Sequence, residues 1–76
     1  MKTPLRLARE RRGMSLFEVA MCTGINQANI SRIERGRQVP STQIAATLAQ
    51  LFGPEITELH IYYPERYADQ AAALGG

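Results

Sequence analysis

The stretch TGINQANISRIERGR, residues 23–37, decides the fold of this chain. Gly24 can adopt the left-handed backbone of a tight turn, because glycine has no Cβ that would clash there. Asn26 is a preferred N-cap residue, so a helix is expected to begin directly after it. Between these two residues, Ile25 is placed to fill the corner of the turn. The stretch therefore predicts a tight turn that leads into a helix.

The helix after the turn has two distinct faces. Ile30 and Ile33 are spaced to point inward together, and Gly36 is expected to end the helix. The opposite face carries Gln27, Ala28, Ser31 and Arg32. That face is either an ordinary solvated surface or the surface that a partner contacts.

A second helix is expected before the turn. Ser15 is followed three residues later by Glu18, which is the spacing of a capping box. Residues suited to an inward face then recur at helical spacing up to the stop at Gly24, namely Leu16, Val19, Ala20 and Thr23. Two short helices joined by a tight turn predict a helix-turn-helix unit.

The rest of the chain also has a helical pattern, because no stretch shows the sustained apolar alternation of a strand. We expect further helices from Thr3-Pro4 to Gly13, from Pro40-Ser41 to Gly53, and between Gly53-Pro54 and Pro64. The last of these contains Ile56, Leu59 and Ile61. The expected fold class is all-α, a compact bundle of five helices in one domain of residues 1–63. Residues 64–76 are expected to form a tail or a short extra helix that reaches Leu74.

Length and composition limit what this chain can be. Its 76 residues are 45% apolar, which supplies one small core and no second domain. A single cysteine, Cys22, forms no internal disulfide, and no Cys/His cluster has metal-ligand spacing. The apolar runs are too short to span a membrane and no charged-then-apolar leader opens the chain, so we expect a cytoplasmic location.

The charge is distributed unevenly along the sequence. Residues 1–40 hold eight basic and three acidic side chains, a net charge of +5, whereas residues 41–76 have a net charge of −3. A basic half favours an anionic partner, of which nucleic acid is the commonest. Charge alone leaves the alternative open that the surface is merely lopsided and binds nothing.

Catalysis is not expected from this sequence. His60 is a lone imidazole without a second ligand or a nearby nucleophile pattern. Ser15, Ser31 and Ser41 suit helix caps or a polar face rather than the position of a nucleophile. The sequence therefore predicts neither an enzyme nor a bound cofactor or metal.

Several of these segments together resemble one known family. They are RERRGMSLFEVA at 9–20, TGIN at 23–26, ISRIERGR at 30–37 and Pro40-Ser41. Over residues 4–60 the chain is similar to the phage repressor and Cro-type helix-turn-helix regulators, also called xenobiotic response element type regulators. The resemblance implies a bundle of five helices whose third helix enters the major groove of double-stranded DNA.

The resemblance also implies roles for individual residues. Those at base-reading positions are Gln27, Ala28, Ser31 and Arg32, and those at phosphate-contacting positions are Asn29, Arg35, Arg37, Gln38 and Ser41, with Arg12 as a further candidate. Cations after the third helix also suit the negative end of its dipole without DNA, and Asn29 either touches a phosphate or faces water. Arg9 and Glu34 occupy the family's positions for a structural ion pair.

Leu16 departs from the family pattern. The family usually has a glutamine there, which bonds a phosphate and braces the first base-reading residue, and leucine can do neither. With Phe17 it either forms a small apolar patch for a partner or packs against the first helix.

The expected function is that of a sequence-specific transcriptional regulator. We expect a Cro-like repressor of a phage or mobile element that acts as a homodimer on a two-fold symmetric operator. Residues expected to make the dimer contact are Tyr62, Tyr63, Tyr67 and Leu74. The alternative is an antitoxin or another protein-binding module, in which the same tail contacts a different protein.

Overall fold

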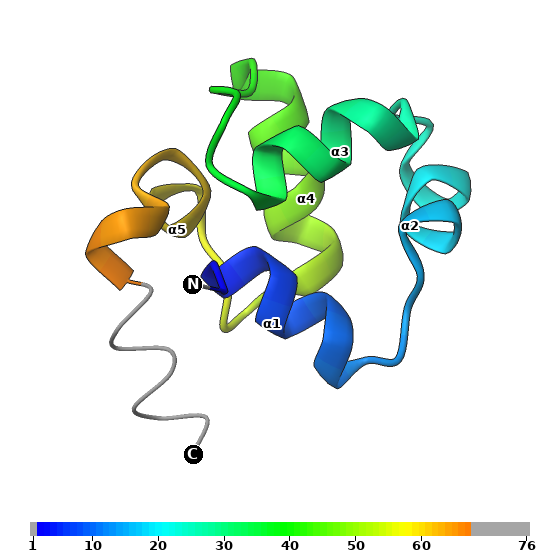
Figure 1. The fold of residues 1–76 in the computed structure, drawn as a ribbon, viewed down its shortest axis with the longest axis horizontal. Helices are drawn as coiled ribbons and strands as arrows, with labels where there is room; N and C mark the ends of the chain where they lie inside the picture. The colour runs from blue at the N-terminus through cyan, green and yellow to red at the C-terminus, as the bar shows by residue number, and fades with distance from the viewer. Residues whose placement is uncertain (1, 68–76) are drawn as a thin grey trace.

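The computed structural model describes residues 2–67, which form a bundle of helices without a strand. The helices are α1 (Pro4–Arg11), α2 (Leu16–Thr23), α3 (Gln27–Glu34), α4 (Thr42–Phe52) and α5 (Glu58–Tyr62) (Figure 1). The expectation of an all-α bundle with a helix-turn-helix is confirmed. Residues 64–67 add a short helical turn, while the rest of the expected final helix, Leu74 included, lies outside the described residues. The domain boundary at residue 63 stays a prediction.

The first helices begin where the sequence places their caps. The side chain of Ser15 accepts a hydrogen bond from the Glu18 amide at 3.0 Å, and the Glu18 carboxylate accepts one from the Ser15 amide, also at 3.0 Å. Asn26 accepts from the Ala28 amide at 2.8 Å. Thr3 caps α1 and Ser41 caps α4 in the same way. Each cap satisfies amides that the first turn of a helix leaves unpaired.

Glycines end helices in two different ways. Gly13, Gly24 and Gly36 have φ of +65°, +75° and +71°, the left-handed conformation that favours glycine. Gly53 after α4 is extended instead, with φ −69°. A Cβ at Gly53 would lie 2.7 Å from the carbonyl oxygen of Ala49, so this glycine is required by close approach and not by its backbone angle.

The core forms where the helices meet. Its buried apolar residues are Leu5, Ala8, Val19, Ile30, Ile33, Ala45, Leu48, Phe52, Ile56 and Ile61. The contacts pair α2 with α3 and α4 with α5, and α1 touches both α4 and α5. Ile25 packs against this core from the turn between α2 and α3, as expected. Burial of these apolar side chains is the main force that holds the short helices together.

The fifth helix is shorter than the sequence predicts. Thr57 has extended backbone and is the N-cap, so α5 begins at Glu58. Ile56, which was expected within this helix, lies outside it. Its side chain enters the core from the loop before α5. Leu59 is 56% exposed on the outer side of α5. The difference arises because Thr57, and not the proline at position 54, occupies the N-cap of this helix.

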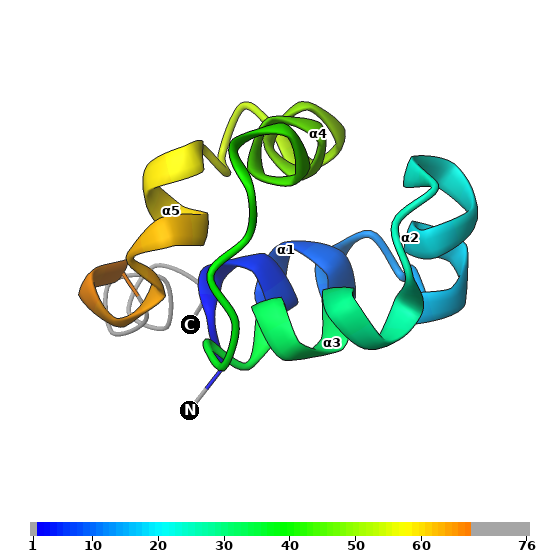
Figure 2. The same ribbon diagram turned by 90° about the horizontal axis from the view of Figure 1, so that it is seen from above.

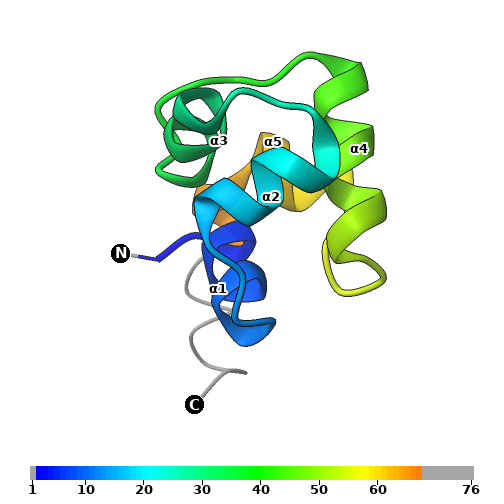
Figure 3. The same ribbon diagram turned by 90° about the vertical axis from the view of Figure 1, so that its right-hand side faces the viewer.

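The arrangement leaves α3 at one side of the bundle. Figure 2 shows α3 along the edge of the ribbon opposite α4, and Figure 3 shows α2 and α3 joined by a short connection and pointing in different directions. Within residues 2–67 no helix is long and apolar enough to cross a membrane.

Candidate nucleic-acid interface

The outer face of α3 presents the residues expected to read bases. Gln27, Ala28 and Arg32 are exposed, and Ser31 is half-buried. Because residues three and four apart lie on one face of a helix, these side chains form a continuous strip. The inner face is apolar, with Ile30 and Ile33 almost fully buried. Tertiary packing thus fixes which side of α3 meets solvent.

Arg32 is held in place by two neutral side chains. Its Nε donates to Oε1 of Gln38 at 2.8 Å, and its Nη2 donates to Oδ1 of Asn29. Asn29 lies one turn earlier on α3, whereas Gln38 comes from the loop between α3 and α4. Sequence reasoning placed Asn29 and Gln38 at phosphates, but in this structure both amide oxygens contact Arg32.

The loop after α3 carries further cations. Arg35 and Arg37 are exposed, and Nε of Arg35 donates to the carbonyl of Ser31 at 3.3 Å. In residues 27–41 the charged side chains are Arg32, Glu34, Arg35 and Arg37. Glu34 is buried, so the exposed charges of this segment are all positive.

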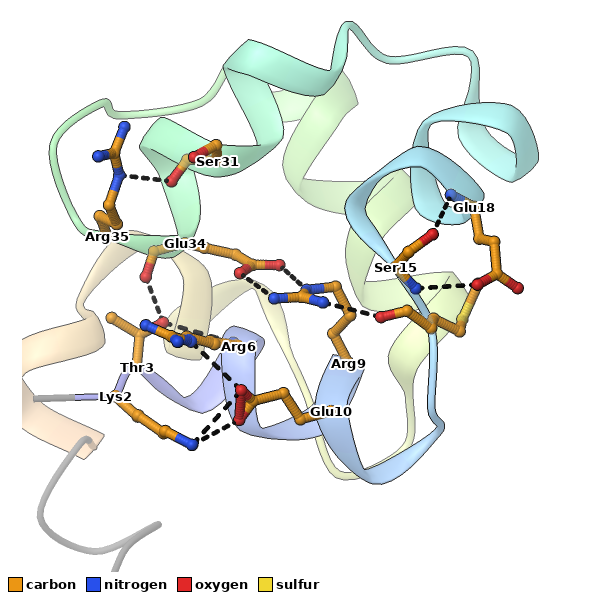
Figure 4. Close-up of polar contacts among 11 residues, drawn as sticks. Lys2, Thr3, Arg6, Arg9, Glu10, Ser15, Glu18, Ser31, Glu34 and Arg35 are labelled. Carbon is orange, nitrogen blue, oxygen red and sulfur yellow. Dashed lines mark hydrogen bonds and ion pairs between the residues drawn. The ribbon is translucent and has the colours of Figure 1, made fainter.

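Glu34 is buried because Arg9 pairs with it. Nε of Arg9 lies 2.6 Å from Oε2 of Glu34 and Nη2 lies 3.2 Å from Oε1, a bidentate contact, while Nη1 donates to the carbonyl of Met14 at 2.8 Å (Figure 4). The two charged side chains are 14% and 4% exposed. The Thr3 hydroxyl also donates to the Glu34 carbonyl. These contacts tie the start of α1 and its middle to the end of α3, and thereby fix the orientation of α3.

Arg12 makes contacts that differ from its expected role. Its guanidinium donates to the carbonyls of Leu51, Phe52 and Gly53 at 2.8, 3.0 and 3.3 Å. It also pairs with Glu55 at 2.6 Å. A cation at the last carbonyls of a helix satisfies unpaired acceptors and the negative end of the dipole. The guanidinium of Arg12 is thus engaged at the C-terminus of α4 and not at the surface beside α3.

Two carboxyl groups have lowered pKa values. A hydrogen bond from Lys2 lowers the pKa of Glu10, with Arg6 as a further cation nearby (Figure 4). A hydrogen bond from Arg12 lowers the pKa of Glu55. Lys2, Arg6 and Arg12 therefore face carboxylates of their own chain, which distinguishes them from the exposed arginines beside α3.

Leu16 and Phe17 are separated by the structure. Leu16 is half-buried and packs against the core, whereas Phe17 is 61% exposed. Of the two alternatives that the sequence left open for Leu16, packing inside the domain is the one observed. Met21, one turn after Phe17 on α2, is 71% exposed. The exposed large apolar side chains of α2 are thus Phe17 and Met21, and Leu16 is not one of them.

The expected dimer residues have different environments. Tyr62 packs against the core, and its hydroxyl is buried without a hydrogen-bond partner among the described residues. Tyr63 is 49% exposed, with the Arg66 guanidinium 4.9 Å from its ring centre. Tyr67 is half-buried with its ring centre 4.4 Å from that of His60. Tyr63 is therefore the tyrosine that offers most surface to a second molecule.

His60 has a local role that sequence reasoning missed. Its Nδ1 accepts a hydrogen bond from the Thr57 amide at 3.1 Å and lies 2.9 Å from the Thr57 hydroxyl. His60 stands three residues after the N-cap, the position that glutamate fills in the α2 capping box. The spacing from threonine to histidine was the available signal. Within residues 2–67, no group of three His, Cys, Asp or Glu side chains gathers as metal ligands would.

This fold, in which a tight turn leads into a third helix whose exposed charge is positive, defines the class of helix-turn-helix proteins. The family described as a helix-turn-helix domain matches residues 4–59, and the chain belongs to it. The resemblance found in the sequence is confirmed.

Curated relatives carry the same description. An uncharacterised HTH-type transcriptional regulator of Archaeoglobus fulgidus is 32% identical over 65 residues, covering 86% of this chain and 93% of the relative. One from Methanocaldococcus jannaschii is 31% identical, covering 82% and 94%. The HTH-type transcriptional regulator DdrOP3 of Deinococcus deserti is 35% identical over 90% of this chain, which spans 52% of that relative. No solved structure matches the chain. The family is therefore one of DNA-binding transcriptional regulators.

Proposed function

We propose that this protein is a sequence-specific regulator that places the outer face of α3 in the major groove. The observation that carries the proposal is the exposed strip of Gln27, Ala28 and Arg32, flanked by Arg35 and Arg37. The major groove admits an α-helix, and each base pair presents there a distinct pattern of donors, acceptors and methyl groups. The function requires no cofactor and no catalytic step.

Each residue of the strip has a fitting partner. Gln27 can pair with N6 and N7 of adenine, Ala28 can pack on the methyl group of thymine, and Arg32 can pair with O6 and N7 of guanine. Ser31, half-buried behind them, is a secondary contact. Arg35 and Arg37 would bind phosphates, which fixes the register of α3 without reading sequence. The amides at the start of α4, next to Ser41, would offer further phosphate contacts.

Base reading is tested with two substitutions and a control. Gln27→Ala and Arg32→Ala should each cost about 1–3 kcal/mol on the preferred site and relax discrimination at one or two base pairs. Gln50→Ala, which removes an exposed glutamine from α4, should leave binding unchanged. Equilibrium titration of the full chain against the preferred duplex and its single-base variants measures both effects. Unchanged discrimination in both α3 variants would mean that another surface reads the DNA.

We also propose that two copies bind one operator and repress transcription in the manner of Cro. A single module of this size covers only one short half-site, and two half-sites about 34 Å apart give the specificity that a genome demands. Exposed apolar side chains near α5 support this pairing. Tyr63 and Val39 line a shared surface pocket of about 280 Å³, and Val39 is 78% exposed. Leu59 precedes Tyr63 by one turn of α5 and is 56% exposed.

The stoichiometry of operator binding tests the pairing. The full chain should bind a two-fold symmetric duplex cooperatively as two copies, even where pairing in free solution is weak, because the DNA raises the effective concentration. Leu59→Lys, with Gln50→Lys as the control for added charge, should abolish cooperativity and preserve half-site binding. One copy per operator would contradict the dimer. Stable co-purification of a different protein that requires Leu59 and Tyr63 would favour the antitoxin-like alternative.

A further inference from the structure

We infer that Asn29 and Gln38 are positioning residues that hold Arg32 for reading guanine, and that they are not phosphate contacts. The inference rests on the proposed function, because it assigns the part of the DNA that Arg32 reads. Its starting point is the pair of hydrogen bonds from Arg32 to Oε1 of Gln38 and to Oδ1 of Asn29.

The bonded atoms determine which donors of Arg32 remain. A guanidinium has five N–H groups in one plane. Gln38 and Asn29 accept from Nε and Nη2, the two nitrogens on one long side of the group. Both N–H groups of Nη1 and one N–H group of Nη2 remain without an acceptor among the described residues. Arg32 thus keeps donors for a second partner, and guanine presents two acceptors, O6 and N7, in the major groove.

The positions of the two holding residues are themselves fixed. Asn29 is half-buried on α3, next to the buried Ile30. Gln38 follows a turn in which the Gly36 amide donates to the Ile33 carbonyl at 3.0 Å and the Arg37 amide to the Arg32 carbonyl at 2.9 Å. Pro40, two residues after Gln38, is buried. Arg32 is therefore held from two rigid directions, α3 and the anchored loop.

Holding Arg32 before DNA binds lowers the entropy lost on binding. A free arginine has many rotamers, and ordering them at an interface opposes association. A guanidinium already held by neutral amides keeps its full charge, because an amide oxygen accepts a hydrogen bond without neutralising the cation. The same amides disfavour rotation of Arg32 toward a phosphate. The consequence is a preference for guanine at one position of each half-site.

The test separates positioning from phosphate contact. Asn29→Ala, Gln38→Ala, Arg32→Ala and the control Gln50→Ala are titrated as full chains against the selected duplex and against the three duplexes that replace the guanine. Each series is repeated over a range of salt concentrations. Arg32→Ala should remove roughly 5- to 150-fold of guanine discrimination. Asn29→Ala and Gln38→Ala should each lower the ratio of affinities for the guanine duplex and the substituted duplexes several-fold. Neither should change the dependence of affinity on salt.

Two further variants make the result specific. Gln38→Glu keeps an oxygen acceptor for Nε of Arg32 and should retain guanine discrimination, although its charge weakens all duplexes. Gln38→Ala added to Arg32→Ala should cause no additional loss of discrimination, because a positioning residue acts only through the residue it holds.

The behaviour of Arg32→Ala distinguishes a failure of this inference from a failure of the proposed function. If Asn29→Ala and Gln38→Ala weaken all four duplexes equally and reduce the salt slope by about 1, they are phosphate contacts and the inference is wrong. If they have no effect while Arg32→Ala loses discrimination, Arg32 reads guanine without their help and the inference is also wrong. If Arg32→Ala itself leaves discrimination intact, the proposed reading by Arg32 fails, and the inference with it.

Discussion

Replacing Arg9 with methionine should destabilise the domain strongly, because it leaves the buried carboxylate of Glu34 without a partner. Within the described residues, Arg9 supplies both hydrogen bonds that this carboxylate accepts, at 2.6 and 3.2 Å. The Glu34 side chain is only 4% exposed, so water cannot replace them readily. Breaking a buried ion pair by removing one partner costs about 3–5 kcal/mol.

This loss is large for so small a domain. The total free energy of unfolding of a natural domain is about 5–15 kcal/mol. For 60–100 residues, each kcal/mol lowers the melting temperature by about 4–8 °C, so Arg9→Met should lower it by at least about 12 °C. Thermal unfolding followed by circular dichroism, with urea titration for the free energy, measures the effect.

Two comparisons make the prediction specific. Arg6→Met removes an arginine whose side chain is 43% exposed and pairs with Glu10 at 3.4 Å on the same helix, and it should cost less than about 1 kcal/mol. Arg9→Met with Glu34→Met removes both buried charges and should recover much of the stability. The reasoning is refuted if Arg9→Met is as mild as Arg6→Met, or if the double variant loses the sum of the two single losses.

Three further predictions follow from other contacts. Arg37→Ala should weaken all duplexes about equally and lower the salt slope by about 1, as binding at several salt concentrations would show; a change in base preference would contradict the phosphate role. Gly53→Ala should lower the free energy of unfolding in urea by about 1–3 kcal/mol, and Gly53→Asn by no less, because any Cβ at this position lies 2.7 Å from a backbone oxygen. At Gly24 the order should be reversed: Gly24→Asn should be milder than Gly24→Ala, because asparagine tolerates positive φ. Because Arg12 lowers the pKa of Glu55, that pair stabilises the fold above pH 4.5, the ordinary value for this carboxyl, and the contribution is lost as the pH falls through the lowered pKa. Arg12→Met should therefore flatten the loss of stability with acid, and an identical acid limb in the variant would show that the pair contributes nothing.

The parts of the fold that follow from local chemistry were predictable from the sequence. The caps Ser15 and Asn26 accept hydrogen bonds from amides two or three residues away. Gly24 is needed because its own φ is positive. The inward face of α3 follows from helical spacing, which places Ile30 and Ile33 together. These features depend on neighbours along the chain, so a sequence contains them directly.

Contacts between distant segments were not predictable from the residues alone. Arg12 reaches carbonyls about 40 positions further along the chain, and no local pattern distinguishes it from a solvated arginine. The partners of Arg32 include Gln38, which belongs to a loop whose path depends on the turn after α3. Residues of the same type thus acquire different roles according to which acceptor the fold brings to them. The pair of Arg9 and Glu34 was anticipated only because the family resemblance implied it.

Selection from a pool of randomised DNA duplexes tests the central claim most directly, because it measures whether α3 reads sequence. Full-length protein should enrich a two-fold symmetric motif with half-sites about one helical turn apart. The Arg32→Ala variant, selected in parallel, should enrich the same motif with the guanine position relaxed in both half-sites and the other positions preserved. Enrichment of no motif by the natural protein, or of an unaltered motif by Arg32→Ala, would contradict the account.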